Sequence, residues 1–502
     1  MKDIQDREDV NEMKDRQNLN DMKDRKDIQS REDNLSREEL KSGENKKNHK
    51  EEMEKIIDSI REELLALGRD LFEHPELGFK EFRTRDQAAS FLERHGMSLE
   101  TGLSMTGFRC TLGQGEGPHI ALIAELDAIP TPGHRCASTD QGAAHACAHS
   151  NQLTIMLGVM KAIHDSGVLA GTGCRVSLIG TPAEEFTDFA FRRSLMEQGL
   201  IRHMSGKQDM IRCGVFDDID LAISCHTMGG VPDRAGDINS SLNGFLSKQI
   251  TYTGQAAHAG ATPHLGVNAL QAANIGLMAV NAQRETFRED DMIRVHGIIT
   301  EGGQTVNSVP ERVRLDYYVR GRTLEAMADA SRKVNRSFEA GAHAMGAQVL
   351  ITDTPGYLPL AQCRDLSAVL RGNLTRFIGE DAIIDGQRSF ASGDIGDLGA
   401  LMPVIQFGFG GFSGNVHGPN FEIADEEMAY LIPAKAVTGT IVDLVMKQGT
   451  LARTILEKNP PRLTREQYLA DWLGIAADAE TASAEADPAS AEATQACEEA
   501  DA

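Results

Sequence analysis

The sequence lacks an apolar run long enough to cross a lipid bilayer, and its first residues are charged throughout. We therefore expect neither a membrane anchor nor a secretory signal. Basic residues are in the minority, since 51 Lys and Arg face 75 Asp and Glu for a net charge of -24. This balance argues against nucleic acid as a partner, because phosphate contacts need basic surface. The eight cysteines show no disulfide-like spacing, which predicts a reducing, cytoplasmic location.

What is present is typical of a globular protein: 41% hydrophobic and 25% charged residues in a chain of 502, enough for two or more domains. The two ends differ from this average. Residues 1–50 repeat themselves loosely and contain almost no apolar residues, which predicts a solvated helix or a disordered arm. Residues 476–502 are rich in Ala and acids, with eight acids and no base after residue 477, and we expect a disordered tail there.

Four apolar runs of strand length each end in groups that can bind a metal ion or move a proton. Helical patterns lie between several of these runs, and strands that alternate with helices indicate an α/β sheet. The carboxyl ends of the strands carry the site in such sheets, so residues far apart in sequence can share one crevice. The runs are residues 119–130, which end in Glu125 and Asp127; 174–185, which end in Glu184 and Glu185; 220–228, with His226; and 402–421, with His417.

Residues 244–350 have a different pattern, which predicts a small α+β domain inserted between the third and fourth of these runs. Two amphipathic helices would cover a four-stranded antiparallel sheet. The insertion would divide the main domain into residues 51–243 and 351–475. The expected strands are residues 245–254, 294–303, 312–321 and 347–354, and the expected helices are residues 266–283 and 324–346.

The stretch 142–158 contains Cys147 and His149 just before an apolar helical pattern. A helix start has free N–H groups and a positive end, which favour a thiolate. Alone, the pair also fits a buried cysteine beside a structural histidine. Together with the strand ends it completes a set of N, S and O ligands that is too large for one catalytic zinc and suits two divalent ions, zinc or manganese. The candidate ligands are Cys147, His149, Glu185, His226 and His417.

Two successive glutamates at one strand end cannot both face the same ion. We expect Glu185 to bind metal while Glu184, turned the other way, acts as the general base that takes a proton from a metal-activated water. The alternative is a solvated pair, which is the usual case for Glu-Glu. The strand before the pair and the intervening residues 181–183 favour a placed pair instead.

Ten short motifs follow one another along the chain: HPELGFKEFRT, AELDAIP, HACAHS, TPAEE, SCH, GQAAHAGATPH, GGQTVNSVPERV, YYVRGRT, SGDIGDLG and VHGPNF. With them, most of the chain, residues 55–450, resembles the two-metal amidohydrolase and metallopeptidase family of aminoacylases, indole-acetyl-amino-acid hydrolases, glutamate-releasing carboxypeptidases and aminobenzoyl-glutamate hydrolases. AELDAIP and SGDIGDLG are most similar to the aminobenzoyl-glutamate hydrolase and dipeptidase branch. The resemblance implies a mixed-sheet catalytic domain with helices on both faces, plus an inserted lid and dimerisation domain.

The resemblance also implies roles for individual residues. Cys147 would bridge the two metals, and Asp127 would orient a ligand. His258 would help stabilise the reaction intermediate from a partner subunit in a homodimer. Asn307 and Arg320 would bind the small amide or dipeptide substrate, for whose carboxylate arginine has the right geometry. The alternatives are that His258 and Arg320 are ordinary surface residues on strands and that Asn307 is a turn residue.

The sequence departs from the family pattern at Ala148 and Ser150, where glycine and an acid or amide are usual. A methyl group at position 148 would crowd a tight turn. These changes motivate an alternative hypothesis, in which a catalytically impaired relative serves as a binding or assembly module. A third hypothesis is a scaffold that acts through its charged ends. Asp394 and Asp397 are expected to shape the loop before the last ligand.

Overall fold

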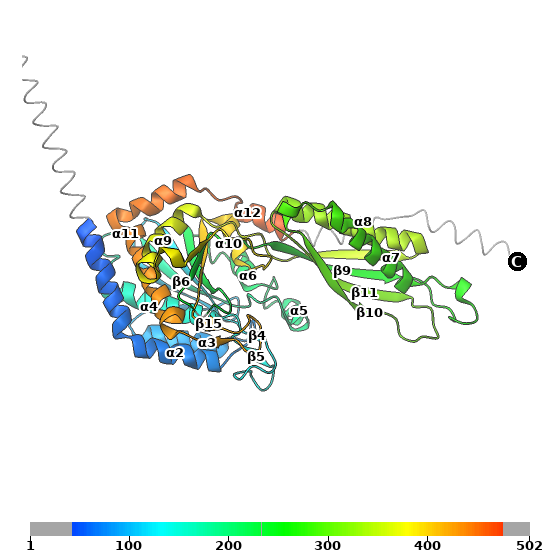
Figure 1. Cartoon of the computed structure of the whole chain (residues 1–502), viewed down its shortest axis with the longest axis horizontal. Coiled ribbons are helices and arrows are strands. Elements are labelled where there is room, and N and C mark those ends of the chain that lie inside the picture. Colours follow the sequence, from blue (N-terminus) through cyan, green and yellow to red (C-terminus); the bar gives the residue numbers. More distant parts are fainter. Residues whose placement is uncertain (1–42, 232, 475–502) are drawn as a thin grey trace, which may run out of the picture.

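The computed structural model describes residues 43–231 and 233–474 (Figure 1). Most of the arm predicted for residues 1–50, and all of the tail predicted for residues 476–502, lie outside the described residues. Residues 43–59 form a helix. Lys50 Nζ in this helix lies 2.6 Å from a carboxylate oxygen of Asp443 in α11 (Ile432–Lys458), so the helix is tied to the main domain.

The main sheet confirms the predicted mixed α/β architecture. Its central strands β6, β3, β7 and β14 are parallel, and β1 and β2 join one side in antiparallel fashion. All four predicted apolar runs are strands of this parallel core. In spatial order the sheet contains β1 (Glu100–Leu103), β2 (Gly107–Gly113), β6 (Arg175–Thr181), β3 (His119–Glu125), β7 (Leu221–Thr227), β14 (Val404–Phe409), β8 (Gly236–Ile238) and β13 (Ile383–Asp385).

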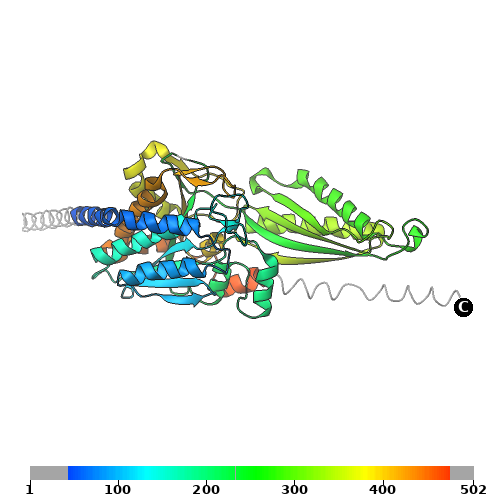
Figure 2. The same cartoon turned by 90° about the horizontal axis from the view of Figure 1, so that it is seen from below.

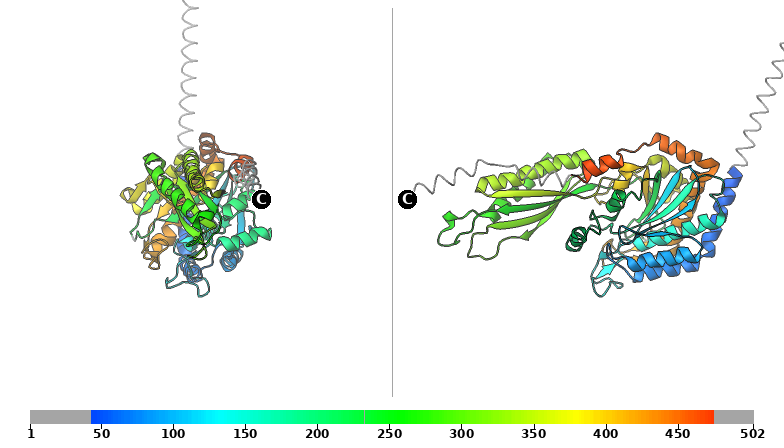
Figure 3. Two further views of the ribbon diagram at one scale, coloured as in Figure 1. Left: turned by 90° about the vertical axis from the view of Figure 1, so that its right-hand side faces the viewer. Right: turned by 180° about the vertical axis from the view of Figure 1, so that it is seen from behind.

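Both faces of the main sheet are buried. Successive residues of a strand point to opposite faces, so each strand contributes side chains to two cores. In β3, Ile120 and Leu122 enter one apolar core, while Ala121 and Ile123 enter the other. Helices on both faces explain why β3 is buried at every position and apolar from Ile120 to Ala124 instead of alternating (Figure 3). One face packs on α2 (Arg61–Glu73), α3 (Phe82–Arg94), α4 (His149–Ser166), α9 (Arg364–Ile378) and α11; the other packs on α6 (Gly206–Arg212) and α10 (Ile395–Leu401).

One helical stretch in the described residues, Glu427–Lys458, has the length and apolar composition of a membrane span. In this fold 89% of its most apolar window is buried inside the protein. Burial against the main sheet accounts for that composition, as expected for a core helix.

The inserted sheet is antiparallel, in the order β10-β11-β9-β12, and it projects from the main domain along the long axis of the molecule (Figure 1). Its two helices lie on one face and leave the other face open (Figure 2). The pairing of β9 with β11 runs from Gly244 and Gly321, beside the main domain, to Thr253 and Arg312 at the far end. The elements are β9 (Gly244–Thr253), α7 (Ala269–Ala282), β10 (Arg294–Glu301), β11 (Arg312–Gly321), α8 (Leu324–Met345) and β12 (Gln348–Pro355).

Candidate metal centre

A thiol and two imidazoles meet above the carboxyl ends of β3 and β7. Helix α4 begins at His149, and Ala148 before it adopts a left-handed backbone with φ of 61°. This turn places Cys147 outside the helix, and its Sγ lies 3.3 Å from Nε2 of His226 in β7. The methyl group of Ala148 is fully buried in this strained turn, so the departure from glycine is tolerated at a conformational cost.

The five predicted metal ligands form two groups that share the sulfur of Cys147. One group contains Cys147, His149 and His226, and the other contains Cys147, Glu185 and His417. Within each group the potential ligand atoms all lie within 4.8 Å of one another. Two ions bridged by one ligand require such an arrangement, because each ion needs its own terminal ligands beside the shared atom.

Some polar atoms of these side chains lack the hydrogen-bond partners that buried groups usually have, which is what metal ligands without their ion would show. His149 Nε2 lies 3.2 Å from Glu125 Oε2, and His417 Nε2 lies 3.0 Å from Glu185 Oε1. Within the described residues, however, His149 Nε2 and Glu185 Oε1 are buried without a partner in hydrogen-bond geometry. Buried polar atoms rarely remain unpaired, and imidazole, thiolate and carboxylate are the donors that zinc and manganese bind.

The electrostatics of the site also favour cations. Burial opposes the thiolate of Cys147, yet His226 and hydrogen bonds from neighbouring histidines hold its pKa well below its ordinary range. Burial raises the pKa of Glu184 well above its ordinary value, and the carboxylates of Glu125 and Glu185 raise it further. A thiolate and several carboxylates are thus packed in one desolvated space, where positive charge is strongly stabilised.

Glu184 belongs to a buried cluster that the sequence did not reveal. Its carboxylate lies within 4.8 Å of those of Glu125 and Asp394. The fully buried Lys207 in α6 lies 2.7 Å from Glu125 Oε1 and also pairs with Asp394. Asp394 was expected only to shape a loop, and Lys207 at the start of α6 is indistinguishable in sequence from a solvated lysine. The cation holds the carboxylates beside Glu184 in place.

Asp127 contacts two of the candidate ligands, His149 and Glu185. Its Oδ1 is 3.2 Å from Nδ1 of His149, whose Nδ1 is also 2.9 Å from the Asp127 carbonyl oxygen. Its Oδ2 accepts a hydrogen bond of 2.9 Å from the backbone N–H of Glu185. One carboxylate therefore orients two candidate ligands and leaves Nε2 of His149 facing the site.

The comparisons with known proteins agree with this geometry. A model of the peptidase family M20/M25/M40 matches residues 121–437. The chain belongs to this family. It is 28% identical over 439 residues to the Xaa-Arg dipeptidase of Mus musculus, covering 82% of this chain and 92% of that protein. It is 30% identical over 274 residues to one of the subunits of the p-aminobenzoyl-glutamate hydrolase of Escherichia coli, covering 53% of this chain and 52% of that protein.

Solved structures share the fold of this M20 chain. A dinuclear metal-binding peptidase of the M20 family from Bacillus subtilis superposes with a TM-score of 0.59 at 20% identity, covering 77% of this chain and 99% of that one. An aminobenzoyl-glutamate utilisation protein from Klebsiella pneumoniae gives a TM-score of 0.58 at 18% identity, covering 80% and 100%. The chain is thus a metal-dependent hydrolase of amide bonds in small molecules or peptides.

Arg320 of the M20 chain lies where the two domains meet. Its Nη1 donates to the Phe390 carbonyl oxygen at 3.3 Å and contacts Ser392 Oγ at 3.2 Å. Its guanidinium also lies 5.6 Å from the ring of Phe245. No carboxylate pairs with Arg320 within the described residues, and its buried Nε has no partner there. A chain of aromatic contacts joins it to the glutamate pair, because Phe245 packs on Tyr357, whose hydroxyl donates to the Glu184 carbonyl oxygen.

His258 and Asn307 lie together, but the single chain does not bring them to the metal ligands. The backbone N–H of Ala259 donates to the Asn307 carbonyl oxygen at 3.0 Å, and both side chains are exposed. They lie beyond the far end of the β9–β11 pair. This pair extends for ten residues, roughly 30 Å, away from the domain junction. Their predicted catalytic and substrate-binding roles stay predictions that need a second chain.

Proposed function

We propose that two divalent ions, zinc or manganese, bind to Cys147, His149, Glu185, His226 and His417. With them the chain would hydrolyse the amide bond of an N-acyl amino acid, an aminobenzoyl-glutamate-like compound or a dipeptide. When bound, such paired ions activate water and stabilise the oxyanion that forms at the carbonyl carbon. The observation that carries this proposal is that two ligand groups share one buried sulfur beside a carboxylate that belongs to neither.

Glu184 is the general base in this proposal. Its 8% exposed side chain lies beside the ligands without belonging to either group that contains Cys147. It would take a proton from the attacking water and deliver it to the departing amine. The Lys207 cluster supports this role, because fixed neighbouring charges keep the carboxylate from turning away.

Two features near the domain junction support the substrate class. Arg320 offers an unpaired guanidinium for the carboxylate of the released amino acid. A cavity of about 550 Å³ lies against the open face of the inserted sheet and is lined in part by Phe186, Phe189 and Tyr318. Phe186 directly follows Glu185, so an aromatic acyl group could rest there while its carbonyl carbon reaches the metals. Relatives named for aminobenzoyl and indole-acetyl conjugates support this choice.

Homodimerisation through the inserted domain is part of the proposal. The edge strand β10 exposes Ile298 and Ile299, and Val306 in the following loop is 99% exposed. An apolar edge strand of this kind can pair with another chain. A partner would also bring His258 and Asn307 to a site that they do not reach within their own chain. We keep a cytoplasmic location as a proposal, supported by the unpaired state of the seven described cysteines.

The decisive experiment applies the same substitution to the two neighbouring glutamates. Glu184→Gln should retain two metal ions per chain and lose amide hydrolysis by at least about 100-fold in kcat. Glu185→Gln should lose metal as well as activity. Elemental analysis and assays on N-acyl amino acids, dipeptides and aminobenzoyl-glutamate measure both effects. Full activity in Glu184→Gln would refute the general base, and full metal content in Glu185→Gln would refute the ligand set.

The dimer proposal is tested by mixing two inactive variants, His258→Ala and Glu184→Gln. If His258 acts across the interface, a mixed dimer has one complete site, and random exchange should restore about a quarter of wild-type activity. If His258 acts within its own chain, the mixture gains nothing, and if it has no role, His258→Ala is active by itself. Light scattering of the wild-type protein measures the oligomeric state independently.

A further inference from the structure

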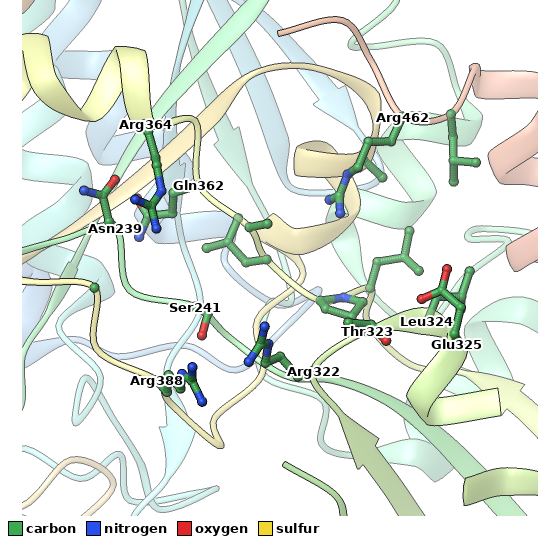
Figure 4. Close-up of a pocket in the computed structure, with 17 residues that line it drawn as sticks. Asn239, Ser241, Arg322, Thr323, Leu324, Glu325, Gln362, Arg364, Arg388 and Arg462 are labelled. Atoms are coloured by element: carbon green, nitrogen blue, oxygen red, sulfur yellow. The ribbon is translucent and has the colours of Figure 1, made fainter. Parts of the chain in front are cut away.

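A cavity at the other side of the domain junction lies away from the metal centre. It has a volume of about 690 Å³ and is lined by residues of both domains. Four arginines face it, against a single glutamate, Glu325 (Figure 4). The lining thus carries three net positive charges in a chain whose net charge is -24. The arginines are Arg322, Arg364, Arg388 and Arg462.

These arginines are poorly neutralised by the protein. Arg364 has neither an ion pair nor a side-chain hydrogen bond within the described residues. Among the same residues, the Arg462 side chain donates only to the carbonyl oxygen of Gly399, at 3.0 Å. Asp290 alone reaches the other two: its carboxylate is 3.1 Å from Arg388 Nη1, and its carbonyl oxygen is 3.4 Å from Arg322 Nη1.

Two helix starts add to the positive potential of the cavity. Arg364 is the first residue of the 15-residue α9, where the helix dipole opposes a cation. Leu324 begins the 22-residue α8, whose N-cap, Thr323, also lines the cavity. Backbone N–H groups and guanidinium groups are both strong donors to oxyanions. A bound anion would offset the cation at the positive end of α9.

We propose that this arginine cavity is a binding site for a multivalent oxyanion, a small phosphorylated or polycarboxylate compound. Its volume lies in the range of small-molecule sites and exceeds the needs of a single inorganic ion. Several guanidinium groups around one space suit a ligand with two or more charged groups, each held in bidentate fashion. The site is separate from the proposed metal centre and does not depend on the catalytic proposal.

A ligand in this cavity would hold the two domains together. Arg322 belongs to the inserted domain, whereas Arg364 and Arg462 belong to the main domain. The segment that carries Arg388 continues to Phe390 and Ser392, which contact Arg320, and then to Asp394 beside Glu184. The anion would therefore bind one end of a segment whose other end supports the proposed catalytic residues.

Titration calorimetry on the metal-loaded full chain tests the proposal, with pyrophosphate and citrate as separate probes and acetate as the monovalent comparison. We expect saturable binding of pyrophosphate, citrate or both, and a loss of at least tenfold in affinity in an Arg364→Gln/Arg462→Gln double variant. The probe that binds more tightly identifies the ligand as phosphorylated or polycarboxylate. Arg336→Gln is the matched control, because Arg336 is exposed on α8 and outside the cavity, and it should change affinity less than twofold.

Both probes chelate metal ions, and chelation is unaffected by the cavity arginines. Binding that persists undiminished in the double variant would therefore overturn the proposal, as would an equal loss in Arg336→Gln or no saturable binding at all. Unchanged metal content and an unchanged circular dichroism spectrum in the double variant verify that it folds.

Discussion

Replacing Asp127 with asparagine tests the link between the fold and the metal centre, because it changes one atom of the carboxylate and keeps its size. In the wild type, Oδ1 faces His149 Nδ1 at 3.2 Å and Oδ2 accepts the Glu185 N–H at 2.9 Å. Asparagine has one acceptor oxygen and one NH2 group, so it can serve only one of these two N–H groups. In either orientation, the other N–H meets a donor.

The size of the effect follows from the tautomer of His149. If the new NH2 group faces Nδ1, the Nδ1–H keeps only the Asp127 carbonyl oxygen as acceptor, and the balance shifts toward the tautomer with its proton on Nε2, the atom that faces the site. A protonated Nε2 cannot bind metal. Loss of such an orienting carboxylate typically lowers metal affinity 10- to 100-fold, which is about 1.4 to 2.7 kcal/mol. If the NH2 group faces Glu185 instead, a buried unpaired N–H costs about 1 to 3 kcal/mol in stability.

Competition with a metal-binding indicator measures the affinity, and urea unfolding measures the stability. Asp209→Asn is the matched control, because Asp209 is also buried and its two carboxylate oxygens accept bonds from Ser104 and Arg202, neither of which is a candidate ligand. The control should lose stability and keep metal affinity. Wild-type affinity for both ions in Asp127→Asn, or an equal loss of affinity in the control, would refute the reasoning.

Three further predictions concern the protein around the site. Lys207→Met should lower the free energy of unfolding by about 3 to 5 kcal/mol in urea, because two buried carboxylates lose their cation; a loss under 1 kcal/mol would contradict this. Burial, together with nearby arginines, lowers the pKa of His119 to about 4 from an ordinary 6.5. The unfolded chain then binds more protons between these values, so stability should fall by up to about 3 kcal/mol as pH drops from 6.5 to 4, and His119→Gln should flatten this fall. Ala148→Gly should change the free energy of unfolding by less than about 1 kcal/mol, because relief of the left-handed strain is offset by the lost burial of a methyl group. Ala148→Val should abolish metal binding, measured by elemental analysis, because a β-branched residue does not tolerate this backbone conformation.

The candidate ligands could be predicted from sequence because each follows directly on a local pattern. Glu185 ends an apolar run of strand length, and Cys147 precedes an apolar helical period. Parallel strands bring their carboxyl ends to one edge, so strand order was not needed to group the residues. The inserted domain was equally predictable, since the edges of β9, β11 and α8 fall within about two residues of the expected ranges.

Lys207 and the arginine cavity were beyond this reasoning because they depend on contacts between distant segments. Lys207 is 82 residues from Glu125 and 187 residues from Asp394, and nothing near it in sequence marks it as buried. The cavity arginines likewise come from four separate segments with ordinary local patterns. Tertiary packing decides what surrounds such polar residues. The periodicity of apolar residues in the sequence does not predict it.

The backbone before Glu184 and Glu185 fixes where their carboxylates lie, and it supports the different roles proposed for them. Ala183, directly before them, adopts a left-handed φ of 52°, which ends the strand direction of β6 and turns the pair into the site. Three different elements then hold this turn: Tyr357 donates to the Glu184 carbonyl oxygen, Arg192 donates to that of Glu185, and Asp127 accepts the Glu185 N–H. The two carboxylates stay close, because oxygens of both lie within 4.8 Å of a ring nitrogen of His149. Among the described residues, they differ in their other neighbours: Glu185 groups with Cys147 and His417, whereas Glu184 groups with Glu125 and Asp394. Strained residues that several neighbours hold in place are common at functional sites. A substitution that frees this turn should therefore remove the difference in surroundings between the Glu184 and Glu185 side chains, even though both carboxylates remain.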